Sequence, residues 1–333
     1  MSMLGIDAAV GQAVPDKSGC QAQPDLRLRA RGRRPACPED AGETPAPQSW
    51  VAQAIIMPIL SARRHLHAFQ ELLALLTRHR QLTWAMTRRE IADRYAGQML
   101  GTFWAVGHPL ALMTIYVFIF GYVFCMKIGG TQQLPLDYTT YLLAGLIPWM
   151  AFQESMAKGA TVIVNNANLV KQVVFPIEVL PVKGVIASFS TQLVATALLA
   201  VYVLLTHGRM PWTYALLPAL FFFQALAMIG AAYILAAVGA YFRDLKDFVQ
   251  VFCIAGMYLM PVVYLPQMVP PAFRPLLHFN PFSYMAWCYQ DACYFGRFEH
   301  PWAWPVFLGG SLGLFYLGYR VFRKLKVCFG SVL

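Results

Sequence analysis

Long apolar blocks without a single charge alternate along this chain with short charged segments. The longest block runs from Met210 to Phe242 and ends at the charged cluster that begins with Arg243. An α-helix rises about 1.5 Å per residue and the hydrocarbon core of a bilayer is about 30 Å thick, so about 20 apolar residues are enough to cross it. The block therefore predicts a transmembrane helix.

Five further blocks follow the same pattern, the second of them interrupted by Asp137. The six predicted spans cover residues 103–126, 136–156, 184–207, 212–241, 248–265 and 302–321. Lipid cannot satisfy exposed backbone groups, so each span must be helical. The predicted fold is an all-α polytopic membrane protein with six transmembrane helices, and a composition of 58% hydrophobic and 13% charged residues agrees with it.

Positive charges give these helices an orientation. With the N-terminus inside, all but four of the 26 Lys and Arg residues fall in cytoplasmic segments, the exceptions being Lys127, Arg209, Arg274 and Arg297. Cytoplasmic loops carry the excess of Lys and Arg, so both termini are predicted in the cytoplasm. The net charge of +10 then reflects orientation and lipid headgroups, and the scatter of the basic residues argues against a nucleic-acid partner.

Three segments outside the spans differ from them in composition. Residues 1–65 are rich in Pro, Ala, Gly and Arg and predict a disordered cytoplasmic tail, although translation from Met57 or a tail without a role is an open alternative. Residues 66–99 predict amphipathic interface and gate helices, with a solvated helix as the alternative. Residues 266–300 are apolar but short and proline-interrupted, which predicts periplasmic re-entrant half-helices with a turn at Asn280 and Pro281.

Several kinds of chemistry have no signature here. The seven cysteines contain no CxxC pair, and the i, i+5 spacing of Cys288 and Cys293 turns their thiols apart on a helix, which disfavours a disulfide in an oxidising periplasm. No GxxxxGK[ST] phosphate loop occurs, and the carboxylates within the predicted spans, Asp137 and Glu154, lie close to the span ends. The energy for any transport must therefore come from another chain.

Several segments in a fixed order carry a family resemblance. They are RREIADRYAGQMLGTFWAVGHPL at residues 88–110, NANLVKQVVFPIEVLPV at 166–182, YFRDLKD at 241–247, MPVVY at 260–264 and NPFSYMAWCYQ at 280–290. Together they resemble the permease subunits of ABC-2 type exporters of O-antigen, capsular polysaccharide and teichoic acid. The resemblance covers about Leu72 to the C-terminus, and the long tail before Leu66 departs from the compact members of that family.

The inner loop between spans two and three has an apolar face. From the residues alone, Asn168 can cap a short helix whose apolar face and exit are set by Leu169, Val170, Val173, Val174 and Pro176. The resemblance implies that this segment, with Lys171, is the coupling helix that docks on a separate ATPase subunit. Packing against the chain's own inner surface is the alternative.

Two further groups take their roles from the resemblance. Arg88, Arg89, Arg94 and Tyr95 would form a cytoplasmic gate that contacts a lipid diphosphate, with simple membrane anchoring as the alternative. The aromatic residues Tyr284, Trp287, Tyr289 and Phe295 would border the channel exit, where rings stack on sugars, with an ordinary aromatic belt as the alternative.

The function that these expectations support is a permease subunit of an ATP-driven exporter of a lipid-linked polysaccharide in the inner membrane. Two copies would form a homodimer with two ATPase subunits. The chain itself would hold no cofactor and no catalytic residue, since ATP and Mg would bind to the partner ATPase. The alternatives are an ABC-2 exporter of a small lipid or drug, and an intramembrane glycosyl- or acyltransferase.

Overall fold

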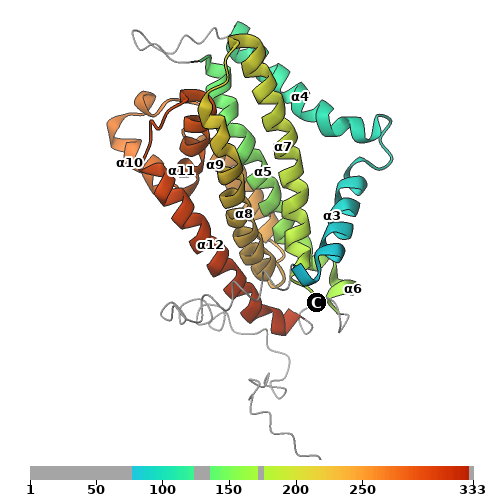
Figure 1. Ribbon diagram of the computed structural model, residues 1–333. Coiled ribbons are helices and arrows are strands. Elements are labelled where there is room, and N and C mark those ends of the chain that lie inside the picture. The colour runs from blue at the N-terminus through green and yellow to red at the C-terminus, as the bar shows by residue number, and fades with distance from the viewer. Residues whose placement is uncertain (1–76, 124–135, 172–175, 330–333) are drawn as a thin grey trace, which may run out of the picture. The chain divides into compact units, whose positions relative to one another are not determined.

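The computed structural model describes residues 77–123, 136–171 and 176–329 (Figure 1). All of them belong to one compact unit, Pro45–Leu333. Within these ranges the chain is all-helical and contains no strand. The all-α prediction is therefore confirmed for the described residues.

Ten α-helices appear among the described residues, joined by short 3-10 and π segments. They are α3 (Arg80–Tyr95), α4 (Trp104–Tyr116), α5 (Tyr138–Asn165), α6 (Ala167–Val170), α7 (Val179–His207), α8 (Leu217–Gly239), α9 (Leu245–Tyr258), α10 (Arg274–Phe279), α11 (Pro281–Gln290) and α12 (Ala303–Leu325). The 3-10 segments are η1 (Gly101–Phe103), η3 (Trp212–Leu216), η4 (Pro266–Met268), η5 (Pro271–Phe273) and η7 (Lys326–Cys328), and the π segments are η2 (Val117–Val123) and η6 (Asp291–Phe295).

Among the described residues, three helical stretches are long and apolar enough to cross a bilayer: Gly101–Phe120, Val179–His207 and Trp212–Gly239. They coincide with the first, third and fourth predicted spans. The helices α5 and α12 also have the length of a span, and α5 carries Glu154 and Lys158 near its inner end. The full set of six spans stays a prediction.

The fifth predicted span, 248–265, is wrong as a continuous helix. Helix α9 has 14 residues and ends at Tyr258, so it is about 21 Å long and shorter than a bilayer core of about 30 Å. The chain then turns at residues 259–265. Pro261 and Pro266 explain the end of the helix, since proline lacks the N–H that an interior helical position donates.

Close backbone contacts hold α8 against α12. A Cβ added to Gly318 would lie 2.1 Å from the carbonyl oxygen of Gly230, and one added to Gly230 would lie 2.5 Å from the carbonyl oxygen of Leu314. Small residues allow two helices to approach in this way without a driving force from water. The helices α5, α7, α8 and α12 thus form the packed centre, and α4 extends away from it (Figure 1).

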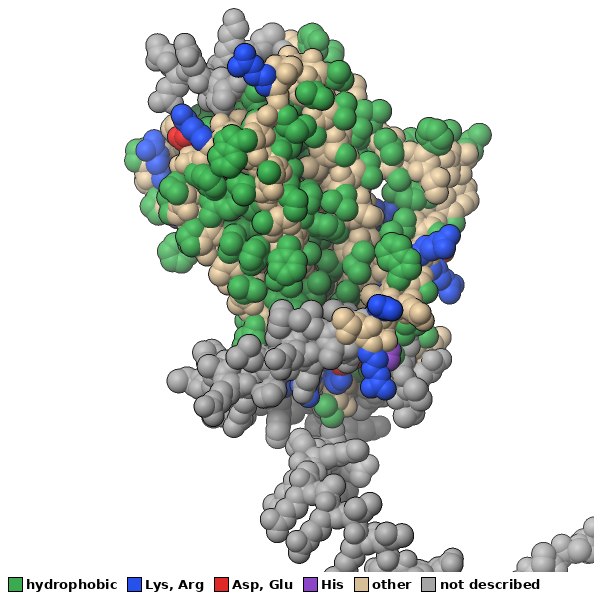
Figure 2. All heavy atoms as spheres, viewed as in Figure 1, with side chains coloured by type: hydrophobic (Ala, Val, Ile, Leu, Met, Phe, Trp, Pro, Cys, Tyr) green, Lys and Arg blue, Asp and Glu red, His purple; other side chains and the backbone are tan. Residues whose placement is uncertain are grey.

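Long-range contacts define the two ends of this helical bundle. At one end, the side chain of Asp137 before α5 meets His207 at the end of α7, with 3.1 Å between Oδ1 and Nε2. At the other end, Glu178 before α7 pairs with Lys326 after α12. Helix α7 therefore runs opposite to α5 and to α12, as the predicted topology requires, and hydrophobic side chains cover the middle of the face in Figure 2.

The segment between α9 and α12 folds into short helices. The helices α10 and α11 meet at Asn280, whose side-chain oxygen accepts a hydrogen bond of 3.0 Å from the backbone N–H of Phe282. This is an N-terminal cap of α11, and it lies at the predicted Asn280 and Pro281 turn. The position of these half-helices in a membrane stays a prediction, as does an amphipathic interface helix, since residues 66–76 lie outside the described ranges.

Candidate functional site

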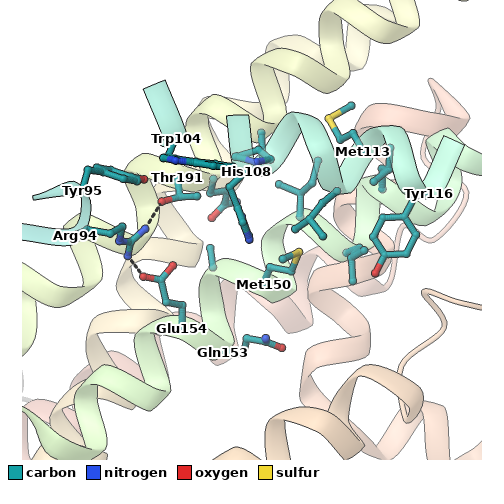
Figure 3. Close-up of a pocket in the computed structure, with 18 of the residues that line it drawn as sticks. Arg94, Tyr95, Trp104, His108, Met113, Tyr116, Met150, Gln153, Glu154 and Thr191 are labelled. Carbon is teal, nitrogen blue, oxygen red and sulfur yellow. Dashed lines mark hydrogen bonds and ion pairs between the residues drawn. The ribbon is translucent and has the colours of Figure 1, made fainter. Parts of the chain in front are cut away.

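A cavity of about 700 Å³ lies between α3, α4, α5 and α7 (Figure 3). Its polar end is lined by Arg94, Tyr95, Gln98, Glu154 and Thr191. The remaining length is mostly apolar, with side chains that include Leu112, Met113, Leu143, Ile147 and Met150. The cavity therefore combines a charged mouth with an apolar interior, and we call it the α4 cavity.

Arg94 joins three helices at the mouth of the α4 cavity. Its guanidinium donates a hydrogen bond of 2.7 Å to Thr191 Oγ1 on α7 and pairs with the carboxylate of Glu154 on α5 (Figure 3). The ion pair is 25% exposed on the arginine side and 31% on the glutamate side. Because Arg94 belongs to α3, this contact holds α3 against the bundle.

The pair extends into a network of five charged side chains. Lys158 Nζ lies 3.1 Å from Glu154 Oε1 and 3.7 Å from Glu90 Oε1. The other oxygen of Glu90 lies 3.2 Å from Lys183 Nζ on α7. Three cations therefore share two carboxylates, which leaves the network with one positive charge in excess. Of the five residues, Arg94 and Glu154 line the α4 cavity, so the excess charge lies beside its mouth and favours a further anion there.

Within this network, the side chain of Lys158 has a lowered pKa. It lies on the part of α5 beyond the second predicted span, with 27% of its side chain exposed. Burial is the main cause that lowers its pKa, to about 8, and Arg94 acts in the same direction while Glu90 opposes both. The charge at the mouth therefore falls as the pH rises through about 8.

The four predicted gate residues divide into two pairs. Arg94 and Tyr95 line the α4 cavity, as described. Arg88 and Arg89 are exposed on α3 and line no described cavity, and Arg89 makes an i, i+4 contact of 3.6 Å with Asp93. The structure therefore brings only Arg94 and Tyr95 to the site.

A buried hydrogen-bond network closes the α4 cavity toward the centre of the bundle. The amides of Gln192 and Gln224 bond to each other at 2.7 and 2.9 Å, and Gln224 also donates to the carbonyl of Pro148 at 3.0 Å. Tyr289 donates to Gln224 Oε1 and is 1% exposed. Its hydroxyl and its ring are both used in packing within this copy, and its place at the channel exit stays a prediction.

Trp287 is a second exit aromatic that proves to be buried. It is 2% exposed and stacks on His300 with 5.5 Å between ring centroids, while Trp302 and Tyr284 close its other sides. The buried carboxylate of Asp291 holds His300 in place, with 2.9 Å from Oδ1 to Nδ1. Trp287 is therefore used in packing within one copy, whereas Tyr284 and Phe295 are half-buried, and the place of all three at the channel exit stays a prediction.

The short helix of the inner loop begins earlier than predicted. Helix α6 begins at Ala167, and the carbonyl of Asn166 accepts from the N–H groups of Leu169 and Val170 at 2.9 and 3.1 Å. Asn168 therefore lies inside α6, and its predicted capping role is wrong. The chain starts the helix earlier because Asn166 both ends α5 and begins α6.

The apolar face of α6 is largely covered by the chain itself. Val170 is 6% exposed and belongs to a buried cluster with Tyr233, Phe322 and Phe329, against which Leu169 is half-buried. This matches the alternative of packing against the chain's own inner surface. The exposed side chains of α6 and its C-terminal end are those of Asn168 and Lys171, Pro176 is half-buried, and the predicted residues Val173 and Val174 lie outside the described ranges.

Residues 81–292 match the family model of the ABC-2 type transporter. The chain belongs to the ABC-2 type transporter family. The matched region of this ABC-2 chain runs from α3 into η6, and it contains every residue named above as lining the α4 cavity.

Three relatives of this ABC-2 chain are named as permease proteins of O-antigen export systems. It is 29% identical to the O-antigen export system permease protein RfbA of Klebsiella pneumoniae over 251 residues, which cover 74% of this chain and 93% of the relative. It is 30% identical to the RfbA protein of Myxococcus xanthus over 222 residues, which cover 66% of this chain and 82% of the relative. A second Klebsiella pneumoniae RfbA protein is 27% identical over 251 residues.

Sequence reasoning missed most of the charged network of the ABC-2 chain. Lys158 and Lys183 counted only as inner positive charges, and Glu90 only as part of an amphipathic helix. One signal was present, because Glu154 and Lys158 stand four residues apart at the inner end of a predicted span. Their meeting with α3 and α7 depends on tertiary packing, which no local pattern records.

Proposed function

We propose that this chain is the permease subunit of an ATP-driven exporter that moves a lipid-linked polysaccharide, of O-antigen or capsule type, across the inner membrane. The family membership supports transport, and the relatives named O-antigen export permease support a polysaccharide as the cargo. The same names weigh against an exporter of small drugs and against an intramembrane transferase.

The α4 cavity is the observation that carries this proposal. An amphiphile with an anionic head and a long hydrocarbon chain matches a site with one excess positive charge at its mouth and an apolar interior. The diphosphate of a lipid carrier would replace Glu154 as the partner of Arg94, whose planar guanidinium suits phosphate oxygens. Tyr95 would border the head group, and Arg88 and Arg89 would attract it to α3.

The partners follow from surfaces that one copy leaves uncovered. Of the apolar window Gly101–Phe120, only 11% is buried, and α9 exposes Phe248, Val251 and Tyr258. These faces support a homodimer that completes the transport pathway. ATP and Mg would bind to two separate ATPase subunits, which would contact α6 near Asn168 and Lys171 on the cytoplasmic side. Tyr284 and Phe295 would face the exit.

The test uses cells that lack this chain and make the polysaccharide. We expect lipid-linked polysaccharide to accumulate on the cytoplasmic side, and the wild-type chain to restore export. Arg94→Gln should reduce export to about a tenth or less, since a charged hydrogen bond is worth about 1.5–3 kcal/mol. Arg243→Gln is the matched control, because it removes the same charge from an exposed residue of the α8–α9 turn.

Two results would count against the proposal. Unchanged surface polysaccharide without the chain would reject the transport function itself. Equal export by the Arg94→Gln and wild-type chains would reject the α4 cavity as the substrate site, while leaving membership of the family untouched.

A further inference from the structure

A second cavity, of about 540 Å³, lies between the α10–α11 hairpin and α12. Its floor is formed by Phe152 of α5 and Ala227 of α8, and its walls include Phe282 of α11 with Phe307, Gly310 and Leu314 of α12. Figure 1 shows α10, α11 and α12 as neighbours on the side of the bundle away from α3 and α4. We call this space the α12 cavity, and of its lining residues the proposed transport mechanism uses Tyr284 alone.

The α12 cavity offers water few hydrogen-bonding side chains, which are the hydroxyls of Ser311 and Tyr284 and the imidazole of His278. Its serine, Ser311, donates to the carbonyl of Phe307 at 2.7 Å, and the hydroxyl of Tyr284 donates to the carbonyl of His278 at 2.7 Å. A buried water needs two to four polar partners, and apolar cavities without them stay dry. An empty space of this size would leave the surrounding side chains without van der Waals contacts, so an apolar occupant is favoured.

The mouth of the α12 cavity is apolar as well. Phe279 and Val306 line it with 90% and 47% of their surfaces exposed. A Cβ added to Gly310 meets no atom within 4 Å, so the glycine leaves real space at the wall. Helix α12 corresponds to the sixth predicted span, and with α12 across the membrane such a mouth would open toward hydrocarbon.

We propose that the α12 cavity is a resident binding site for one acyl chain of a membrane phospholipid, which supports the α10–α11 hairpin against α12. A helix of a second copy fits the space less well, because a helix with its side chains is about 10–12 Å wide and the cavity is walled by α5, α8, α11 and α12. A flexible chain can follow those walls and gains free energy with each methylene buried.

The experiment compares two variants that differ by one position. Full-length protein is placed in nanodiscs of phosphatidylcholine that carries a photoactivatable diazirine in one acyl chain, and labelled residues are located by mass spectrometry. Gly310→Phe fills the cavity, whereas Gly309→Phe adds the same ring at an exposed position that does not line it. Both sites leave open space for a Cβ, and Gly310→Leu serves if the Phe variant does not fold.

We expect label on Phe282, Phe307 and Leu314 in the wild-type chain and in Gly309→Phe. In Gly310→Phe this label should fall by about tenfold, which corresponds to two displaced methylene groups. Equal labelling in the two variants would overturn the proposal, and so would crosslinks between two copies at these residues. Displacement of the label by a small amount of polyprenyl phosphate would assign the cavity to the carrier lipid and equally overturn it.

Discussion

The ion pair between Arg94 and Glu154 permits a quantitative test of the α4 cavity. Glu154→Gln leaves Arg94 and Lys158 without their shared carboxylate, and Arg94→Gln leaves Glu154 with Lys158 alone. The pair is neither fully exposed nor fully buried, so its coupling energy should lie between the 0.2–1 kcal/mol of surface pairs and the 3–5 kcal/mol of buried ones, at about 1–2 kcal/mol.

A double-mutant cycle measures that coupling directly. In domains of about 150–250 residues each kcal/mol shifts the melting temperature by about 2–4 °C, so a loss of about 1–2 kcal/mol should make each single variant melt about 2–8 °C below the wild type. In the double variant Arg94→Gln with Glu154→Gln, the melting temperature should fall by much less than the sum of the two single decreases. The reason is that the second change removes a group that the first has already left unpaired. Arg94→Lys controls for the loss of charge.

The two single variants should act in opposite directions on anion binding. Glu154→Gln raises the excess positive charge at the mouth and should tighten binding of a polyprenyl diphosphate, whereas Arg94→Gln should weaken it. Additive melting shifts within about 1 °C, together with equal affinities in all variants, would refute the reasoning that the network both holds α3 and attracts an anion.

Three further predictions concern other parts of the chain. Because the lowered pKa of Lys158 is about 8, binding of a polyprenyl diphosphate should weaken between about pH 7 and 9, and Lys158→Arg should remove that dependence in a titration of affinity against pH. Val170→Asp should unfold the permease itself because it buries a charge, whereas Lys171→Glu should leave folding intact and reduce co-purification of the ATPase; the reverse pattern would reject our account of α6. Trp287→Ala should lower the melting temperature through the loss of a buried ring, while Tyr284→Ala should reduce export of polysaccharide more than stability, and equal stability losses would show that both rings only pack.

Local sequence patterns predicted most of the helices because their causes are local. The apolar blocks around Val179–His207 and Trp212–Gly239 became helices of the expected position, and the turn at Asn280 follows from its side-chain cap. Proline at position 261 was also visible, yet the apolar run hid its effect, and α9 ended at Tyr258 instead of continuing.

The candidate site depended on contacts that the sequence does not display. Arg94 contacts Thr191, which lies 97 residues away in the sequence. Trp287 is buried against the rings of His300 and Trp302, which only the fold brings together. Val170 looked available to a partner because hydrophobicity marks burial without saying which surface provides it. Residue types were therefore informative about chemistry and uninformative about which side chains share a cavity.

Photocrosslinking from inside the α4 cavity tests the central claim most directly. A benzophenone amino acid at Met150, which lines the cavity, should form an adduct with the lipid-linked polysaccharide in cells whose partner ATPase is inactive, while the same probe at the exposed Leu312 of α12 should not. A glycan-bearing adduct at Met150 alone is the result that our account predicts. Phospholipid adducts without glycan at Met150, or equal glycan adducts at both positions, would contradict it.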